Sequence, residues 1–409
     1  TLVLPGIRDL VIDGSTDVVL TAEYVGSAAN YPVLAGLQPD LYRCFMAQTW
    51  GHASNQGTVT LVHLESHFTD EKAGLLRSET YARLRRHWQF INELKLYEIQ
   101  DQKIYGVNVY GVPRPYVRFL SAASLYHPDT VERSLRHDGS GPEPGFKDPD
   151  GNWDQRPHAG RIITVTDDTL RTWHEILETD SVPIRQTRMV YTVNRAVAEV
   201  LANLAQHDRV GSLGLEFSRG WDESIDRKKG FFESRWGAPT AWADVILQGP
   251  HLYVATPLYK IPNSTMKHQQ DWSATDFEML APDAIPVTAY KPAGDRARYN
   301  LNYTQWGVAG PARSHYRIAW RRMAANTGER TLIPALIPPG AAHIDGVFSA
   351  GLPKGSMAAL ISVTGTLSSL ICDFAIRANP KNDIRAPQVN RLPIVLDHPL
   401  QPELVLRTL

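Results

Sequence analysis

The sequence predicts an α/β protein with two domains, residues 1–205 and 206–409. Strand-like and helix-like segments alternate through the first half, whereas the second half reads mainly as short strands joined by loops. A chain of 409 residues is long enough for two domains with separate cores. A hydrophobic share of 43% and a charged share of 21% are typical of a soluble globular protein.

The elements of the first domain follow from local patterns. Residues 1–30 contain only short apolar runs, and we interpret them as a linker or a partial element. Pro39 and Asp40 predict a helix that begins at Leu41, because both residue types suit the first turn of a helix. The next segments predict a strand, a helix and two further strands, at residues 57–64, 70–84, 90–97 and 103–111.

Glycine and proline are dense over residues 137–160, which predicts an exposed loop. Two helices are predicted after it, Thr166–Leu177 with aspartate near its start and Asn194–Ala205 with an apolar face. We place the domain boundary at the end of the second helix. Beyond it the sequence predicts short strands at residues 213–217, 245–249, 251–255 and 285–290.

The later domain contains an apolar segment, residues 332–337, that ends in Pro338, Pro339 and Gly340. This pattern predicts a short buried strand running into a rigid turn. Just upstream, Trp320 is surrounded by arginines. Cations beside a strand and a turn are suited to a surface that contacts the phosphates and bases of DNA. The alternative is a solvated basic edge on an ordinary strand.

Several separate segments in this region carry a family resemblance: Trp320–Ala324, Asn326–Pro334, Pro338–His343, Phe348–Ser349, Leu367–Phe374 and Gln388–Pro393. Together they resemble the specificity region of large adenine-N6 DNA methyltransferases. These occur in type IIG restriction-modification enzymes and related phage-defence systems, and they carry a Taq-type target recognition domain. Upstream, Leu41–Phe45 and the segment with Gly74 and Arg77 are similar to the end of the methyltransferase domain in that family.

The resemblance implies an architecture and a set of partners. Residues 1–205 would be the tail of a Rossmann-like class I methyltransferase domain with a loop insertion and a helical spacer. Residues 206–409 would be an α/β target recognition domain. The expected partners are double-stranded DNA, an upstream catalytic half of the same protein, and other defence-system subunits. A DNA-binding specificity subunit without chemistry of its own is the alternative.

The family transfers a methyl group from S-adenosylmethionine, but the motifs for this chemistry are missing here. Adenine methylation needs a glycine-rich cofactor turn and an (Asn/Asp/Ser)-Pro-Pro-aromatic strip that holds the flipped base. The Pro338-Pro339 pair follows Ile337, which has no acceptor, and precedes Gly340, which cannot stack. We therefore expect no catalytic residue and no cofactor for this chain alone, with the catalytic half upstream of Thr1.

Charge is distributed unevenly along the chain, whose formal net charge is -1. Residues 251–409 hold 16 lysines and arginines against 11 aspartates and glutamates, whereas residues 1–250 hold 26 against 32. The last third is thus the better candidate for contact with a polyanion. Three clusters interleave cations with aromatic residues, and their alternative is solvated loops whose aromatics belong to the core. The candidate DNA-binding residues are Lys228, Lys229, Lys260, Lys267, Lys291, Arg296, Arg298, Arg317, Arg321 and Arg322.

One candidate metal site is present in the first domain. His63, Glu65 and His67 alternate, so on a strand they would share one face. We favour polar groups at the end of a sheet strand, and we expect no bound metal.

Asp222, Asp226 and Lys228 resemble the carboxylate-lysine arrangement of Mg-dependent nucleases, a less favoured alternative because the motif is short. The two cysteines, Cys44 and Cys372, exclude a cysteine-rich zinc site and suit a reducing cytoplasm. No apolar run is long enough to span a membrane.

Overall fold

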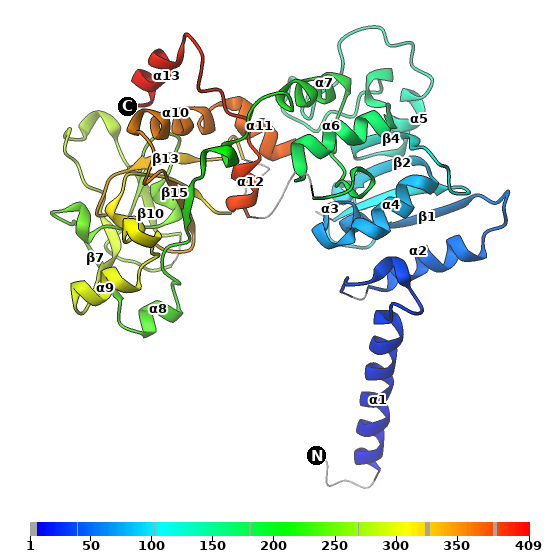
Figure 1. Ribbon diagram of the computed structural model, residues 1–409, viewed down its shortest axis with the longest axis horizontal. Helices are drawn as coiled ribbons and strands as arrows, with labels where there is room; N and C mark the ends of the chain where they lie inside the picture. Colours follow the sequence, from blue (N-terminus) through cyan, green and yellow to red (C-terminus); the bar gives the residue numbers. More distant parts are fainter. Residues whose placement is uncertain are drawn as a thin grey trace. The chain divides into compact units, whose positions relative to one another are not determined.

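The computed structural model describes residues 6–38, 40–101, 103–179, 181–268, 270–323, 328–378 and 383–409 (Figure 1). The predicted α/β class is confirmed, because helices occur together with both parallel and antiparallel strand pairs. The chain divides into two compact units, unit 1 from Thr1 to Ala205 and unit 2 from Gln206 to Leu409. Pro39 of the predicted helix start, and Asn326 of the segment that carries the resemblance, lie outside the described residues.

Unit 1 is built on one five-stranded sheet. Its helices are α1 Ile7–Gly26, α2 Leu41–His52, α3 Ser66–Thr69, α4 Gly74–Arg83, α5 Pro128–Ser134, α6 Asp167–Leu177 and α7 Arg195–Leu204. Its strands are β1 Val59–Leu64, β2 Leu84–Ile91, β3 Ile104–Tyr110, β4 Arg118–Leu125 and β5 Ile163–Thr166, in the order β1-β3-β2-β4-β5. β3 is antiparallel to β1 and to β2, β4 is parallel to β2, and β5 is antiparallel to β4. β1 and β2 therefore run in the same direction.

A buried arginine holds α4 in unit 1. The guanidinium of Arg77 donates hydrogen bonds to the carbonyl oxygens of His67 (2.9 Å) and Gln186 (2.8 Å). Gly74, one turn earlier, faces the same segment, and a Cβ on it would lie 2.5 Å from Gln186 Oε1. The glycine and the arginine singled out in the sequence thus serve the packing of α4.

Residues 7–26, interpreted from the sequence as a linker or a partial element, form the helix α1. None of its residues is buried, and Leu10 and Val18 are about 70% exposed. The prediction of a strand at residues 90–97 is wrong, because β2 ends at Ile91. There the buried Asn92 amide donates to the carbonyls of Tyr97 (3.0 Å) and Ile99 (2.9 Å) and folds the chain into a loop.

The helices α6 and α7 confirm the sequence prediction. Thr166 rather than an aspartate caps α6, by accepting from the Thr169 N–H. Asn194 caps α7 by accepting from the Val197 N–H at 2.8 Å. Between α5 and a short turn at Ala159–Arg161 no helix is described, which agrees with the predicted loop.

The described residues of unit 2 form one four-stranded sheet and three strand pairs. Its helices are α8 Ile225–Lys228, α9 Arg296–Asn302, α10 Met357–Leu367, α11 Leu370–Ala378, α12 Ala386–Asn390 and α13 Gln401–Thr408. Its strands are β6 Glu216–Ser218, β7 Phe232–Gly237, β8 Ile246–Leu247, β9 Lys260–Pro262, β10 Trp272–Ala274, β11 Thr288–Pro292, β12 Arg317–Arg321, β13 Pro334–Ile337, β14 Ala342–His343 and β15 Val347–Gly351. The four-stranded sheet has the strand order β13-β12-β15-β6, and all its neighbouring strands are antiparallel. The strand pairs are β10-β9, β11-β7 and β14-β8, of which β14-β8 is parallel.

The strand and turn predicted around residues 332–340 are confirmed as β13 and its exit. Gly340 has a φ of 96°, a conformation that favours glycine, and its N–H donates to the Arg313 carbonyl at 2.6 Å. Trp320 of β12 is buried, and its indole N–H donates to the Ile384 carbonyl at 2.9 Å. The strand expected at residues 251–255 is wrong, because the chain there makes a tight turn closed by hydrogen bonds between Tyr253 and Thr256.

Among the described helices, no single one is both long and apolar enough to cross a membrane. Only α10 and α11 taken together reach that length and composition, and they are bent by 61° at the break between them.

Candidate nucleic-acid interface

Arg317 lies inside unit 2, so the prediction that it binds DNA is wrong. Its side chain is fully buried, and its guanidinium donates to the carbonyl oxygens of His315 (3.3 Å) and Ala341. Burial lowers the pKa of Arg317 from its usual value. Arg313 is also buried and donates to the carbonyls of Ala243 (2.6 Å) and Gly340. These two arginines therefore support the turn after β13.

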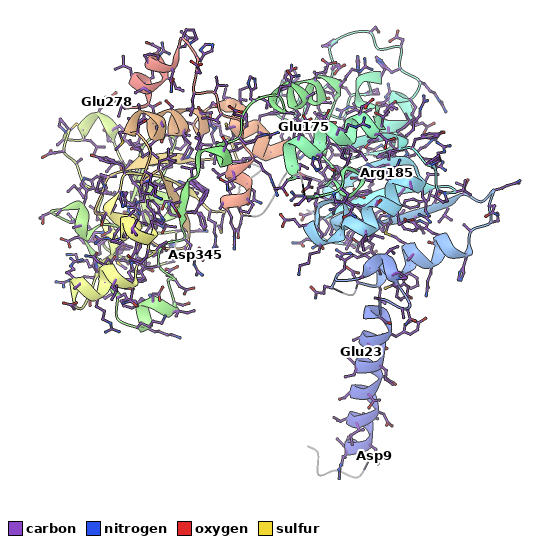
Figure 2. All side chains as sticks on the ribbon, in the orientation of Figure 1. Asp9, Glu23, Glu175, Arg185, Glu278 and Asp345 are labelled. Carbon is purple, nitrogen blue, oxygen red and sulfur yellow. The ribbon has the colours of Figure 1, made fainter. Side chains whose placement is uncertain are left out.

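Arg321 and Arg322 are two of the predicted DNA-binding residues, and both side chains are engaged within unit 2. Arg321 is half-buried, and its Nε donates to the Gly249 carbonyl at 2.7 Å. Arg322 forms ion pairs with Asp345 (2.6 Å; labelled in Figure 2) and Asp383 (3.5 Å). Since two carboxylates pair with Arg322, this side chain is a poor candidate for a phosphate contact.

Other cations gather where the chain around α8 meets the start of α9. The Ala293 N–H donates to the Phe231 carbonyl at 2.9 Å, which joins the segment before α9 to the segment after α8. The Arg298 guanidinium lies over the Phe231 ring, with Cζ 5.3 Å from the ring centre. We call this region the α8–α9 surface, and its cations are Arg227, Lys228, Lys229, Lys291, Arg296 and Arg298.

The cations of the α8–α9 surface differ in how far they are neutralised. Lys229 pairs with Asp226 at 3.2 Å, and Arg296 pairs with Asp244. Lys291 of β11 is half-buried and lies opposite Glu233 of β7. By contrast, Lys228 and Arg298 are exposed, and neither forms an ion pair with any carboxylate in the part of the chain that the structure describes. These two side chains are the most available to an incoming phosphate.

The remaining predicted residues, Lys260 and Lys267, belong to the β9-β10 hairpin. Lys260 is half-buried, with Nζ 5.3 Å from the centre of the Tyr259 ring. Lys267 is exposed, and its backbone N–H donates to Asp271 at 2.9 Å. Hydrogen bonds from Thr265 and its neighbours lower the pKa of Asp271 to about 2, so this carboxylate holds the hairpin loop together.

The carboxylates of the nuclease alternative serve the local turn at α8. Asp222 Oδ1 accepts from the N–H of Ile225 at 2.8 Å, and Asp226 Oδ2 accepts from the Asp222 N–H at 2.9 Å. Asp226 also pairs with Lys229. Both carboxylates are thus occupied by backbone and lysine donors around one helical turn.

The polar groups at the end of β1 form a buried network. Glu65 Oε2 lies 2.7 Å from His87 Nε2 and accepts from the Tyr191 hydroxyl at 3.1 Å. His63 Nε2 lies 2.8 Å from the Tyr110 hydroxyl. Within the described residues, no group of three or more histidine, cysteine, aspartate or glutamate side chains could hold a metal ion. The sequence did not reveal His87 or Tyr191, which lie far from Glu65 along the chain.

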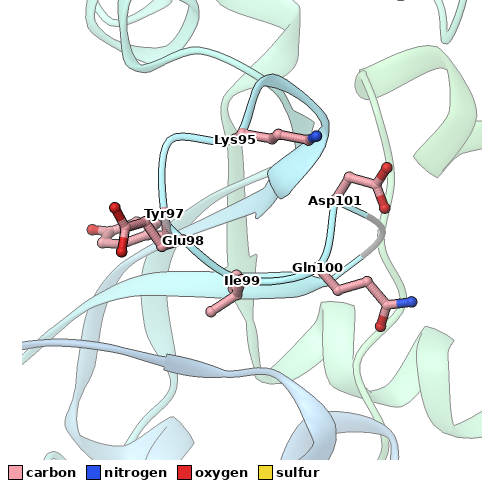
Figure 3. A pocket seen from close by; sticks show the side chains of 6 residues that line it. All are labelled: Lys95, Tyr97, Glu98, Ile99, Gln100 and Asp101. Carbon is pink, nitrogen blue, oxygen red and sulfur yellow. The ribbon is translucent and has the colours of Figure 1, made fainter.

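One surface pocket of about 370 Å³ lies on the loop between β2 and β3 (Figure 3). It is lined by Lys95, Tyr97, Glu98, Ile99, Gln100 and Asp101. All six belong to one short loop, so this pocket brings together no groups from separate elements. Cys44 and Cys372 are buried free thiols.

Comparisons with known proteins do not assign this chain to a family. No family model matches the chain, and no curated protein matches it. Among solved structures, the type IIG restriction endonuclease BpuSI aligns with 92% of this chain at 11% sequence identity and a TM-score of 0.30. The alignment covers 45% of the BpuSI chain, so this chain spans less than half the length of that protein. A TM-score this low does not establish a shared fold.

Proposed function

We propose that this chain is the DNA-recognition part of a DNA adenine-N6 methyltransferase from a restriction-modification or phage-defence system. Unit 2 contacts double-stranded DNA through the α8–α9 surface. The observation that carries this proposal is the exposed pair Lys228 and Arg298, whose charges no described carboxylate neutralises. Cations of this kind displace the counterions condensed on DNA and so provide binding free energy. Arg227 and Lys229 add charge beside them.

The order of elements in unit 1 supports the methyltransferase part of the proposal. Apart from the short helix α3 after β1, the elements β1, α4, β2 and β3 occur in the order strand, helix, strand and strand. The family resemblance implies this order for the second half of a class I methyltransferase sheet. We infer that unit 1 is the tail of such a domain and that unit 2 is its target recognition domain.

The methyl donor of the proposed enzyme is S-adenosylmethionine, and the turn after β1 does not fit it. The strand-to-helix turn after β1 is formed by Glu65 and Ser66 and contains no glycine. Glu65 is buried there against His87 and Tyr191, so its carboxylate is not open to a ribose. The methyl donor would therefore be held by another part of the enzyme, and the second candidate function is a DNA-binding specificity subunit that acts with a separate catalytic part.

The test measures duplex binding by fluorescence anisotropy at several salt concentrations. Each phosphate contact that is removed should reduce the slope of log Kd against log salt by about 1. We expect Lys228→Gln and Arg298→Gln each to weaken binding and flatten this slope. Lys354→Gln is the matched control, because Lys354 is also exposed in unit 2 but lies in the turn before α10.

Equal losses of duplex affinity in Lys354→Gln and in the two α8–α9 variants would show that any exposed cation of unit 2 contributes to binding. The proposed interface would then be wrong. Sequencing of methylated adenines in cells that carry the full gene separates the two candidate functions. Loss of methylation at one sequence motif in the Arg298→Gln strain supports the methyltransferase. A strain in which no adenine is methylated at any motif favours the specificity subunit.

A further inference from the structure

Two tyrosine rings stack on the surface of unit 2 near the start of β9. The Tyr253 and Tyr259 ring centres are 4.6 Å apart, and the ring planes differ by 26°. Both side chains are half-buried. Among the described residues of unit 2, neither belongs to the packed clusters that contain Trp320, Trp221 and Val245. The stack is therefore not explained by core packing.

Two cations lie beside this stack. Lys260 Nζ is 5.3 Å and Arg321 Cζ is 5.8 Å from the centre of the Tyr259 ring. Arg321 is held in place by its hydrogen bond to the Gly249 carbonyl. Aromatic rings flanked by cations suit a ligand that is itself planar and carries a negative charge, since the ring stacks while the cation attracts the charge.

The backbone fixes the position of Tyr253. Tyr253 and Thr256 exchange two backbone hydrogen bonds of 3.0 and 2.9 Å, and the Ala255 N–H donates to the Pro334 carbonyl at 2.8 Å. Ala255 adopts a φ of 70°, which is strained for a residue with a Cβ. Such strain persists only where the surroundings over-determine it, and it clusters at ligand-binding sites. The turn thus fixes the backbone of Tyr253 next to β13.

We propose that the Tyr253-Tyr259 stack, with Lys260 and Arg321, binds an unpaired nucleobase of a DNA strand together with an adjacent phosphate. The base stacks on Tyr253, and Lys260 contacts the phosphate. This proposal rests on the DNA-binding function proposed for unit 2, but it uses a different set of residues from the α8–α9 surface. A site of this kind would favour DNA in which one base is displaced from the helix.

The experiment compares the full chain on two duplexes of equal length, one fully paired and one with a single extrahelical adenine, and on a short single-stranded oligonucleotide. Stacking of one base predicts at least about fivefold tighter binding to the extrahelical duplex. Tyr253→Ala should abolish this preference, whereas Tyr253→Phe should retain it because the ring remains. Lys260→Gln should weaken binding to the single strand and lower its salt dependence.

The Lys228→Gln variant separates this proposal from the proposed function, because it should weaken both duplexes equally and leave their ratio unchanged. Suppose that the chain binds the paired duplex but shows no preference for the extrahelical adenine. The stacking site is then wrong, and the DNA interface stands. The same conclusion follows if the preference survives in Tyr253→Ala with an unchanged circular dichroism spectrum. If no duplex binds, the proposed interface is wrong, and loss of single-strand binding in Tyr253→Ala but not in Tyr253→Phe still supports the stack.

Discussion

At the scale of single residues, burial separates arginines that look alike in the sequence. Arg317 is fully buried and donates to backbone carbonyls, whereas Arg298 is exposed. A buried donor that is removed leaves its acceptors unsatisfied and leaves a cavity behind. Arg317 is therefore part of the fold of unit 2, whereas Arg298 of the α8–α9 surface is available to a ligand.

Replacing Arg317 tests this distinction. We expect Arg317→Ala to reduce the free energy of unfolding by on the order of 2–4 kcal/mol, because the cavity and the unpaired His315 and Ala341 carbonyls both act against the folded state. Lys228→Ala, on the exposed surface, should change it by no more than about 0.5 kcal/mol. Urea unfolding followed by tryptophan fluorescence measures both. A stable Arg317→Ala protein with weakened DNA binding would restore Arg317 to the interface.

At the scale of elements, the exit of β13 depends on one glycine. Gly340 has a φ of 96°, and a Cβ on it would lie 2.9 Å from the Ala243 nitrogen and 3.0 Å from the Trp242 carbonyl carbon. A substitution there meets both a strained backbone and a neighbouring backbone that cannot move aside easily. The turn therefore fixes how β13 connects to β14.

Gly340→Ala should destabilise unit 2 by about 2–4 kcal/mol, from backbone strain and from the steric clash together. The matched control is Gly214→Ala, because Gly214 also has a positive φ of 67° but has no atom within 4 Å of an added Cβ. Strain alone should cost about 1–2 kcal/mol in the control. Thermal unfolding of the two variants gives the comparison, and equal losses would rule out the clash.

At the scale of the whole molecule, buried histidines in both units should make stability depend on pH, His63 and His67 in unit 1 and His251 and His343 in unit 2. Burial lowers the pKa of His251 to about 4 and that of His343 to about 3. In the unfolded chain both would titrate near their usual value of about 6.5. Between these values the unfolded state binds protons that the folded state does not, so stability falls as pH decreases from about 6.5 towards 4 and is level above 6.5.

The loss should be on the order of 2–3 kcal/mol for each histidine at pH 4. Urea unfolding between pH 4 and 8 measures the slope. His343→Asn should flatten the profile even if it lowers stability overall, whereas His398→Gln, at an exposed position, should leave its shape unchanged. A profile of the same steepness in His343→Asn would show that other groups dominate.

The sequence by itself determined the elements whose signals are local. The capped helix α7, the strand β1 and the β13 exit with its two prolines and Gly340 were all predicted, because periodicity, caps and turn residues act within a few positions. The Gly-Pro-rich loop at residues 137–160 was predicted for the same reason. The α/β class follows from such elements taken together.

Only the tertiary structure decided which side chains face solvent and which are already paired. Arg317 and Arg298 carry the same charge, but Arg317 donates to buried carbonyls, whereas Arg298 is exposed and lies over the Phe231 ring. Likewise, Glu65 meets Tyr191 across more than a hundred residues of chain. Pairing and burial depend on which distant segments come together. The packing of the whole unit decides this, and a local pattern of residues does not reveal it.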